Sequence, residues 1–219
     1  MNLTLKNKDQ ITISALILAG GESIRMGQDK GRLTFNDCSL ITHVCTVAQD
    51  CLDFVFVITP STQKYQDLLP KRVQIIEEKI VLANRQSNFP LLGFYQGFNQ
   101  LSSDWLLLLA CDLPKLNSRA VREWLQVLDS VSSSTMAVLP RHAKGWEPLC
   151  GFYHRQCLPS LEKYLQSGGK SFQRWLKEIA VEELVVSDRS VLFNCNTWEE
   201  WQQFLSERKS DSQSSENLD

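Results

Sequence analysis

The stretch LILAGGESIRMGQDKGRL, from Leu16 to Leu33, decides how this chain of 219 residues folds. Its first residues continue an apolar run that starts at Ile13, which is typical of a strand covered on both faces in a parallel sheet. Two glycines, Gly20 and Gly21, come next. Because they lack a Cβ atom, the backbone can approach a ligand closely and point amide N–H groups at phosphate oxygens. A buried strand that ends in such a turn predicts a nucleotide phosphate site.

Two cations follow the glycines. Arg25 carries a planar fork of donors that suits phosphate oxygens, and Lys30 adds a compact point charge. The segment contains neither GxGxxG nor the GK[ST] ending of a P-loop, so neither a Rossmann dinucleotide site nor a Walker NTPase is indicated. The alternative interpretation is an ordinary turn between a strand and a helix with solvated charges, and spacing alone leaves it open.

Strand patterns alternate with amphipathic helical patterns along the rest of the chain. The predicted strands are 53–59, 73–76, 105–110, 135–140 and 181–187, and the predicted helices are 39–49, 61–69, 91–101, 118–129, 157–166, 171–179 and 198–205. The segment RHAKGWEPLCGFY, residues 141–153, is expected to form a loop and then a strand that lies across the edge of the sheet. This alternation predicts right-handed βαβ units in an α/β fold, a Rossmann-like three-layer sandwich with a mostly parallel central sheet. We expect one domain over residues 1–205 and a disordered tail over the polar, serine-rich residues 206–219.

Composition excludes several classes of protein. A net charge of −2 gives no reason to expect nucleic acid or a membrane surface as a partner, and no window approaches the ~18 apolar residues of a membrane span. The seven cysteines contain no CxxC pair and there are only three histidines, so neither a zinc site nor a disulfide framework is indicated. With no secretory signal, the expected location is the cytoplasm, where a Cys150–Cys157 bridge is not expected.

A run of leucines before Asp112 marks the second candidate for chemistry. The segment DWLLLLACDLP predicts a buried strand with Asp112 at its carboxyl end, where ligands bind in open α/β sheets. A carboxylate there can hold Mg²⁺ while phosphate oxygens and waters complete the coordination shell. The alternative is an aspartate that caps the next turn before Pro114. Asp29, beside Lys30, is expected to be solvated or to pair with Lys30 or Arg25.

Taken together, LAGGESIRMGQDK resembles the motif LxGGxSxRMGxDK of the nucleotidyltransferases, and in particular of the molybdenum cofactor guanylyltransferases of MobA type. The resemblance implies a fold like that of the nucleotide-diphospho-sugar transferases. It also implies backbone contacts to GTP from Leu18, Ala19, Gly20 and Gly21, with Arg25 and Lys30 on the triphosphate. The segment CDLP resembles the CDxP motif of the family, which implies that Asp112 binds both GTP and the metal.

The second half of the chain resembles the side of the family that binds the acceptor. WEPLCGFYHR, LQSGGKSFQRWL and NCNTWEE are similar to its segments, and the acceptor candidates are Pro148, Leu149, Lys170, Asn194 and Asn196. The alternative is that Lys170 lies on a solvated helix face and that the two asparagines cap the last helix, as Thr197 can also do. Residues alone do not decide between these interpretations.

Two departures from the family pattern are visible. The family usually has GPLxG where this chain has FPLLG from Phe89, and asparagines, Asn84 and Asn88, stand where an aspartate is usual upstream. Whether the loop from Glu77 to Pro90 contacts the base or the ribose is therefore left open. Only Gly21 favours guanine over cytosine as the base. Trp198 replaces a proline, which suits a first helical turn but is not required there.

The resemblance implies a Mg²⁺-dependent transfer of GMP from GTP to the phosphate of molybdenum-loaded molybdopterin, with release of pyrophosphate. The implied partners are GTP and molybdopterin, together with proteins that deliver the cofactor and molybdoenzymes that receive it. Three alternatives stay open: cytidylyl transfer to molybdopterin, transfer to a sugar or alcohol phosphate, and a non-catalytic protein that only binds GTP.

Overall fold

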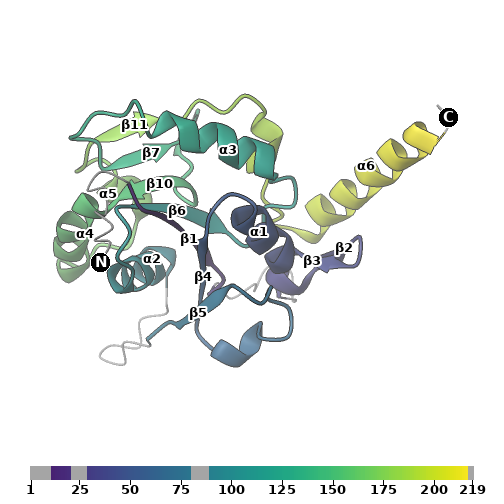
Figure 1. Cartoon of the computed structure of the whole chain (residues 1–219), viewed down its shortest axis with the longest axis horizontal. Helices are drawn as coiled ribbons and strands as arrows, with labels where there is room; N and C mark the ends of the chain where they lie inside the picture. The colour runs from purple at the N-terminus through teal and green to yellow at the C-terminus, as the bar shows by residue number, and fades with distance from the viewer. Residues whose placement is uncertain (1–10, 21–28, 80–88, 217–219) are drawn as a thin grey trace, which may run out of the picture.

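The computed structural model describes residues 11–20, 29–79 and 89–216, with side chains described as far as residue 208 (Figure 1). Its centre is a seven-stranded sheet in the order β11-β7-β10-β6-β1-β4-β5. From one edge to the other the strands are β11 Val181–Glu183, β7 Ala137–Leu139, β10 Cys150–His154, β6 Trp105–Ala110, β1 Ile13–Leu18, β4 Phe54–Thr59 and β5 Gln74–Glu77. Only β10 runs antiparallel to its neighbours among these strands, which confirms the expected mostly parallel sheet.

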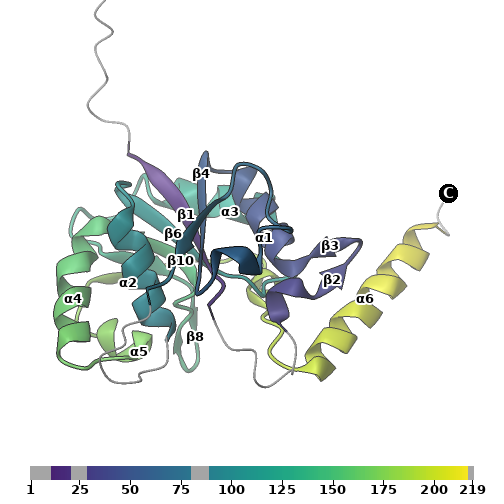
Figure 2. The same cartoon turned by 90° about the horizontal axis from the view of Figure 1, so that it is seen from below.

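Helices cover both faces of the sheet, as Figures 1 and 2 show. One face packs against α1 Leu40–Gln49 and α3 Ser118–Val127, and the other against α2 Pro90–Gln100, α4 Leu158–Gln166 and α5 Phe172–Trp175. Strand β1 serves both layers, because Ala15 and Ile17 join the first apolar cluster while Leu16 joins the second. The expected three-layer sandwich is therefore confirmed, with two apolar cores separated by the sheet.

The sequence signals for helix starts are confirmed where a polar side chain caps a helix. The Ser39 hydroxyl accepts a hydrogen bond from the amide of Thr42 at the start of α1. Asn117 accepts one from the amide of Ala120 at the start of α3. Each cap satisfies one of the N–H groups that a helix leaves without an intrahelical partner.

Several elements differ from the expected ones. The helix expected at 61–69 is reduced to the 3-10 turn η2 Thr62–Lys64, and the helix expected at 171–179 to α5. The strand expected at 181–187 ends after three residues, and Val185 beyond it is 77% exposed. Strand β10 was expected across the edge of the sheet, but it lies inside, between β6 and β7. Its first four residues are buried, so both faces of the strand are covered.

The C-terminal helix is longer than expected. α6 extends from Trp198 to Glu216, which corrects the end expected at Leu205 and the disordered tail expected from residue 206. The segment contains neither glycine nor proline, so nothing in it stops a helix. Its first turns pack on the hairpin of β2 Thr34–Phe35 and β3 Cys38–Ser39, and the rest runs outward from the body (Figures 1 and 2).

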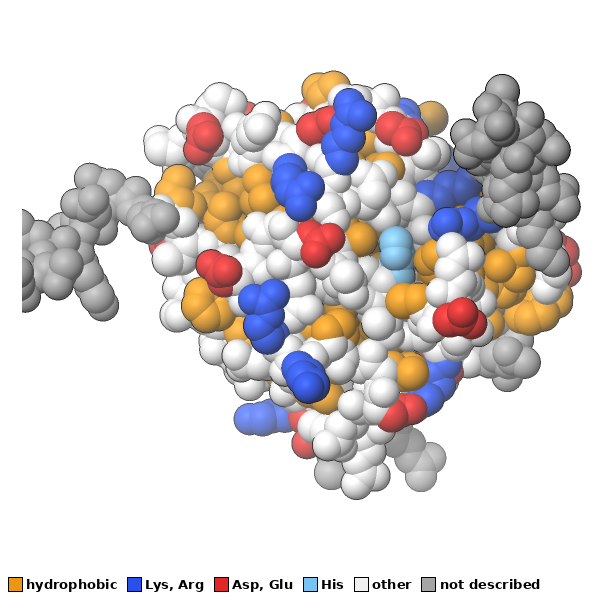
Figure 3. Space-filling model, turned by 45° about the vertical axis from the view of Figure 1, so that its right-hand side comes forward, with side chains coloured by type: hydrophobic (Ala, Val, Ile, Leu, Met, Phe, Trp, Pro, Cys, Tyr) orange, Lys and Arg blue, Asp and Glu red, His pale blue; other side chains and the backbone are white. Residues whose placement is uncertain are grey.

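Other expectations concern the surface and the cysteines. All seven cysteines are free thiols, as expected for Cys150 and Cys157 in particular. Figure 3 shows basic and acidic side chains interspersed over the face that it presents. Among the described residues, no helix combines the length and the apolar character needed to cross a membrane.

Candidate functional site

A cavity opens at the carboxyl ends of the central parallel strands. Leu18, Ala19 and Gly20 line it where β1 ends, and Asp112 lines it just after β6. Strands β1 and β6 are hydrogen-bonded neighbours, with Leu18 in register with Ala110. The two sequence motifs that were predicted to bind phosphate and metal therefore meet at one edge of the sheet, where open α/β folds bind their ligands.

Lys30 connects three segments of the chain in this cavity. Its Nζ atom lies 2.9 Å from Oδ2 of Asp112 and 3.0 Å from Oδ1 of Asn196. The side chains of Lys30 and Asp112 are 18% and 13% exposed, so water screens their attraction only in part. These contacts join residues 82 and 166 positions apart in sequence. A cation, a carboxylate and an amide oxygen thus share one point on the wall of the cavity.

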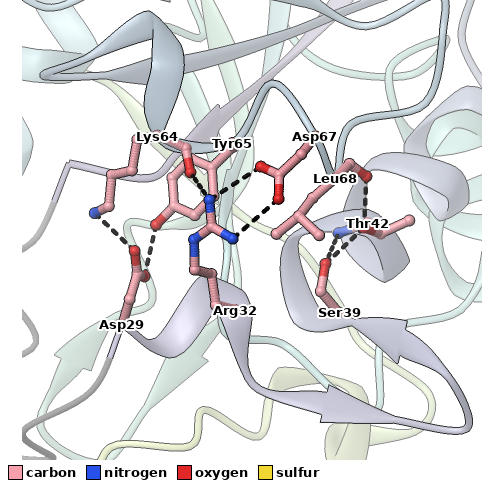
Figure 4. Close-up of polar contacts among 8 residues, drawn as sticks. All are labelled: Asp29, Arg32, Ser39, Thr42, Lys64, Tyr65, Asp67 and Leu68. Atoms are coloured by element: carbon pink, nitrogen blue, oxygen red, sulfur yellow. Dashed lines mark hydrogen bonds and ion pairs between the residues drawn. The ribbon is translucent and has the colours of Figure 1, made fainter.

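The backbone around Lys30 is fixed by Asp29 (Figure 4). One carboxylate oxygen of Asp29 accepts hydrogen bonds from the Gly31 amide at 3.1 Å and the Tyr65 hydroxyl at 2.7 Å. The other lies 3.1 Å from Nζ of Lys64. The expectation that Asp29 is solvated or pairs with Lys30 is therefore corrected, because Lys64 and Tyr65, which follow β4, bind its carboxylate. A pairing with Arg25 lies outside the described residues.

The Tyr65 hydroxyl is a stable hydrogen-bond donor to Asp29. Its side chain is buried, at 1% relative exposure, and Lys64 lies with Nζ 4.9 Å from the centre of its ring. Burial raises the pKa of Tyr65 far above its usual value, and the neighbouring Cys111 and Asp29 raise it further. The phenol therefore keeps its proton at neutral pH and donates a hydrogen bond to Asp29.

A second set of contacts ties the turn η1 Lys30–Arg32 to the segment after β4 (Figure 4). The Arg32 guanidinium binds both carboxylate oxygens of Asp67, at 3.2 and 3.0 Å, and donates to the carbonyl of Lys64. The ion pair is exposed, so its contribution to stability is small, but its bidentate geometry fixes direction. The turn that begins with Lys30 is therefore held at both ends, by Asp29 before it and by the contacts of Arg32 at its end.

Glu78 is a site residue that the sequence reasoning missed. It follows β5, it is only 5% exposed, and its amide donates to the carbonyl of Thr59. Its carboxylate fills the space beside Gly20 and Gly93, because a Cβ atom added at these positions would come 2.6 and 3.3 Å from its oxygens. The available signal was its place directly after a strand of the parallel sheet, the same signal that pointed to Asp112.

Comparison with known proteins places this site in a family. The MobA-like NTP transferase domain matches residues 15–183, which include most of β1 and both Lys30 and Asp112. This chain belongs to the MobA-like NTP transferase family. A probable molybdenum cofactor guanylyltransferase of Trichormus variabilis is 47% identical over 188 residues, which cover 86% of this chain and 88% of that protein. One from Synechococcus elongatus is 39% identical over 192 residues, with 88% and 97% covered.

Solved structures show the same fold. The molybdopterin-guanine dinucleotide biosynthesis protein A of Archaeoglobus fulgidus superimposes with a TM-score of 0.72 at 16% identity, covering 90% of this chain and 99% of its own. A putative protein of Aquifex aeolicus gives a TM-score of 0.68 at 21% identity, with 85% and 94% covered. The expected fold, that of the nucleotide-diphospho-sugar transferases, is therefore confirmed for this MobA-like transferase.

The donor set around Asp112 suits a hard cation that keeps part of its water shell. Among the described residues, no group of three or more His, Cys, Asp or Glu side chains could enclose a metal ion. One carboxylate next to an amide oxygen is nevertheless the arrangement that Mg²⁺ accepts, because phosphate oxygens and waters supply its other ligands. Asp112 and Asn196 of this MobA-like transferase fit such an ion.

The acceptor candidates are only partly brought together. Leu149 lines the cavity, and Asn196 reaches Lys30, while the Asn194 Oδ1 atom is buried with no hydrogen-bond partner among the described residues. Pro148 and Lys170 lie outside the lining that the described residues form. The Pro148 carbonyl accepts a hydrogen bond from Tyr153, and Nζ of Lys170 lies 5.9 Å from the centre of the Phe89 ring.

The remaining candidates are outside the described residues. Gly21 and Arg25 fall in the segment 21–28, and Asn84 and Asn88 in the segment 80–88. Their predicted contacts with the triphosphate and the base stay predictions. The described part of the site in this MobA-like transferase therefore consists of the β1 turn, Lys30, Glu78, Asp112 and the segment around Asn196.

Proposed function

We propose that this protein transfers GMP from GTP to the phosphate of molybdopterin, releases pyrophosphate, and depends on Mg²⁺. The observation that carries the proposal is the position of the Lys30 ammonium, 2.9 Å from the Asp112 carboxylate and 3.0 Å from the Asn196 amide oxygen. The names of the relatives, molybdenum cofactor guanylyltransferases, support the choice of GTP and molybdopterin as substrates.

The turn after β1 would hold the donor. Backbone amides at Leu18, Ala19, Gly20 and Gly21 would face the triphosphate, with Arg25 and Lys30 as its cations. Nucleotidyl transfer is catalysed mainly by the positioning of anions and the neutralisation of charge that builds on the leaving pyrophosphate. Lys30 is suited to this role because its ammonium is already directed into the cavity by its two partners.

Asp112, with help from Asn196, would hold the metal ion. When bound there, Mg²⁺ would supply positive charge that offsets the charge of the leaving group. Lys30 would bind phosphate oxygens from the place that its contacts with Asp112 and Asn196 give it. The acceptor phosphate attacks the α-phosphorus in line, so no covalent intermediate on the protein is required.

The C-terminal half would present the acceptor. Leu149 lines the cavity and Asn196 contacts Lys30 at its wall, and Pro148, Lys170 and Asn194 would contribute from the segments beside it. Delivery of the pterin by another protein and its transfer to a molybdoenzyme are part of the proposal. A division of labour in a single domain follows, with the donor held by the first half and the acceptor by the second.

The test is pyrophosphate release by the purified protein from GTP, Mg²⁺ and molybdenum-loaded molybdopterin. We expect turnover with GTP, little with CTP, and loss of turnover in the D112A variant. Equal rates with CTP would replace guanylyl by cytidylyl transfer. Tight binding of GTP without turnover on any pterin acceptor would overturn the proposal in favour of a protein that only binds the nucleotide.

A further inference from the structure

The segment that contacts Lys30 is also the start of α6. Asn196 directs its amide oxygen to Lys30, and Thr197, the next residue, directly precedes the helix. Asn196 is exposed, so burial does not hold its side chain in place. Whatever keeps this asparagine pointed at Lys30 must act through its backbone.

That backbone is held by Glu200. One carboxylate oxygen of Glu200 accepts hydrogen bonds from the amide of Asn196 at 2.7 Å and the amide of Thr197 at 3.0 Å. The Thr197 hydroxyl in turn accepts a hydrogen bond from the amide of Glu200 at 3.2 Å. The exchange between Thr197 and Glu200 is a capping box, which needs only these two residues. The shorter bond to Asn196 is additional and extends the cap to the residue that contacts Lys30.

Glu200 is itself attached to a fixed part of the molecule. Trp201 and Phe204, on the same turns of α6, are 3% and 2% exposed and pack on the ring of Phe35, with centroids 6.1 and 5.3 Å away. On the other side of Asn196, the buried Cys195 donates its amide to the carbonyl of Asp112 at 3.3 Å. The backbone of Asn196 is thus held between the Asp112 loop and the first turn of α6.

We infer that Glu200 is a positioning residue: by binding the amide of Asn196, it places the amide oxygen that keeps Lys30 beside Asp112. The inference rests on the proposed function, in which Lys30 binds the triphosphate. Glu200 acts through Asn196 and Lys30 and itself needs no contact with the substrate. Loss of its carboxylate releases Asn196 and lets the Lys30 ammonium leave its place.

The experiment compares three variants with a matched control. E200A removes both bonds of the carboxylate, whereas E200Q keeps an oxygen that can accept them. T197A removes the hydroxyl cap but leaves the bond between Glu200 and Asn196. N117A is the control, because it removes the cap of α3, a helix that contributes no described residue to the lining of the cavity. Thermal unfolding should show comparable losses of cap stability in E200A, T197A and N117A.

The first readout needs no substrate. Brief acetylation with acetic anhydride, followed by peptide mass spectrometry, reports how exposed and free each lysine is. Labelling of Lys30 in E200A should rise severalfold relative to Lys71 in the same protein, and it should stay at the wild-type level in E200Q, T197A and N117A. Unchanged labelling of Lys30 in E200A, with the stability loss present, would overturn the inference and leave Glu200 as a helix cap only.

The second readout is kinetic. We expect kcat/KM for GTP to fall about tenfold in E200A, the size expected for loss of one hydrogen bond to a charged group, and to recover in E200Q. N117A should keep the wild-type value. Absence of turnover in the wild-type protein would overturn the proposed function, while the labelling result would still decide the role of Glu200. If E200A does not fold, E200D takes its place in the same labelling assay, because its shorter side chain draws the carboxylate away from the Asn196 amide, and T197A remains the comparison.

Discussion

Lys30 and Lys170 lie in similar stretches of sequence and in different surroundings. Both belong to short glycine-containing segments, DKGR and GGKS, and both were predicted to contact phosphate. The Lys30 ammonium bonds to a carboxylate and an amide oxygen, whereas the Lys170 ammonium lies 5.9 Å from the centre of the Phe89 ring on an exposed residue. A glycine beside a lysine therefore does not by itself build a phosphate site.

The glycines near Lys170 have a packing reason. A Cβ atom on Gly169 would come 2.3 Å from the ring of Tyr164, and Gly168 has a φ of +85°, in the left-handed region that favours glycine. The Tyr164 hydroxyl donates to the carbonyl of Ser171 at 3.2 Å. The turn between α4 and α5 thus needs glycine, because a side chain there would meet Tyr164 of α4. Gly20, by contrast, makes room for the carboxylate of Glu78 at the cavity.

Removal of the charge of Asp112 should have the largest effect on activity. D112N keeps the size of the side chain but removes the ion pair with Lys30 and the carboxylate that we propose as a ligand for Mg²⁺. We expect kcat/KM to fall by about 10²–10³, the range for loss of one preorganised electrostatic partner. Pyrophosphate release over a Mg²⁺ titration measures it, with E123Q as a control for an exposed ion pair, that of Arg119 and Glu123 on α3. Activity within threefold of the wild type would refute a metal role for Asp112.

The two lysines themselves should differ strongly. K30M removes the cation at the carboxyl end of the sheet, and we expect a loss of about hundredfold in kcat/KM for GTP, near the lower end of that range. K170M removes an exposed charge that we propose for the acceptor side, so at saturating acceptor it should change kcat/KM for GTP less than about fivefold. The stabilisation of each variant by GTP, measured as a shift in Tm, gives an independent readout. Equal losses in the two variants would break the distinction between the two regions.

Much of the fold could be predicted from the sequence because buried strands have plain signals. The leucine run of β6 and the β-branched run of β4 needed no knowledge of their partners. Strand β10 was misplaced because its pairing with β6 and β7 depends on segments distant in the chain. The length of α6 was missed because its second half is polar, although polar residues such as Glu, Gln and Lys are good helix formers.

The residues of the site can also be divided into those that could be predicted from the sequence and those that could not. Asp112 could be proposed because it directly follows a buried strand of the parallel sheet, and Lys30 because it stands in the motif that begins where β1 ends. Tyr65 and Glu200 could not, since their roles come from single hydrogen bonds to Asp29 and Asn196. Tyr65 lies 36 positions from Asp29. Tyr65 belongs to no recognised motif, and although Glu200 ends the segment NCNTWEE, only its bond to the Asn196 amide connects it to Lys30.

A matched pair of tyrosines sharpens the comparison between the regions. Y65F removes the hydroxyl that binds Asp29 beside Lys30, and Y164F removes the hydroxyl that binds the backbone beside Lys170. Each should cost about 1 kcal/mol in the free energy of unfolding, the usual value of one hydrogen bond. Only Y65F should also weaken GTP binding, by about threefold to fivefold, because the turn of Lys30 loses one of its anchors. Urea unfolding and isothermal titration with GTP measure the two effects, and a loss of GTP affinity in Y164F would contradict this assignment.

The smallest expected effect is a pH dependence of stability that comes from His43 of α1, whose ring packs on Phe35. Its ring lies edge-on to Phe35 at 5.2 Å, and Nε2 is 2.9 Å from the carbonyl of Leu116. Burial lowers the pKa of His43 below its usual value, and Arg208 lowers it further, against the opposing effect of the Leu116 carbonyl. The unfolded chain therefore binds this proton at a higher pH than the folded protein does. Stability should fall as the pH drops below about 6.5, the pKa of an unperturbed histidine, and the fall should continue until the folded pKa is passed.

Urea midpoints at pH 7.5 and 5.5 measure this contribution. H43Q retains an amide N–H that can donate to the Leu116 carbonyl but has no group that titrates in this range. The decrease between the two pH values should therefore be smaller in H43Q than in the wild type by a few tenths of a molar in urea. An equal decrease in both proteins would mean that the cluster of Phe35 and α6 tolerates a charged imidazole. The packing that holds Asn196 toward Lys30 would then be looser than its buried aromatic rings indicate.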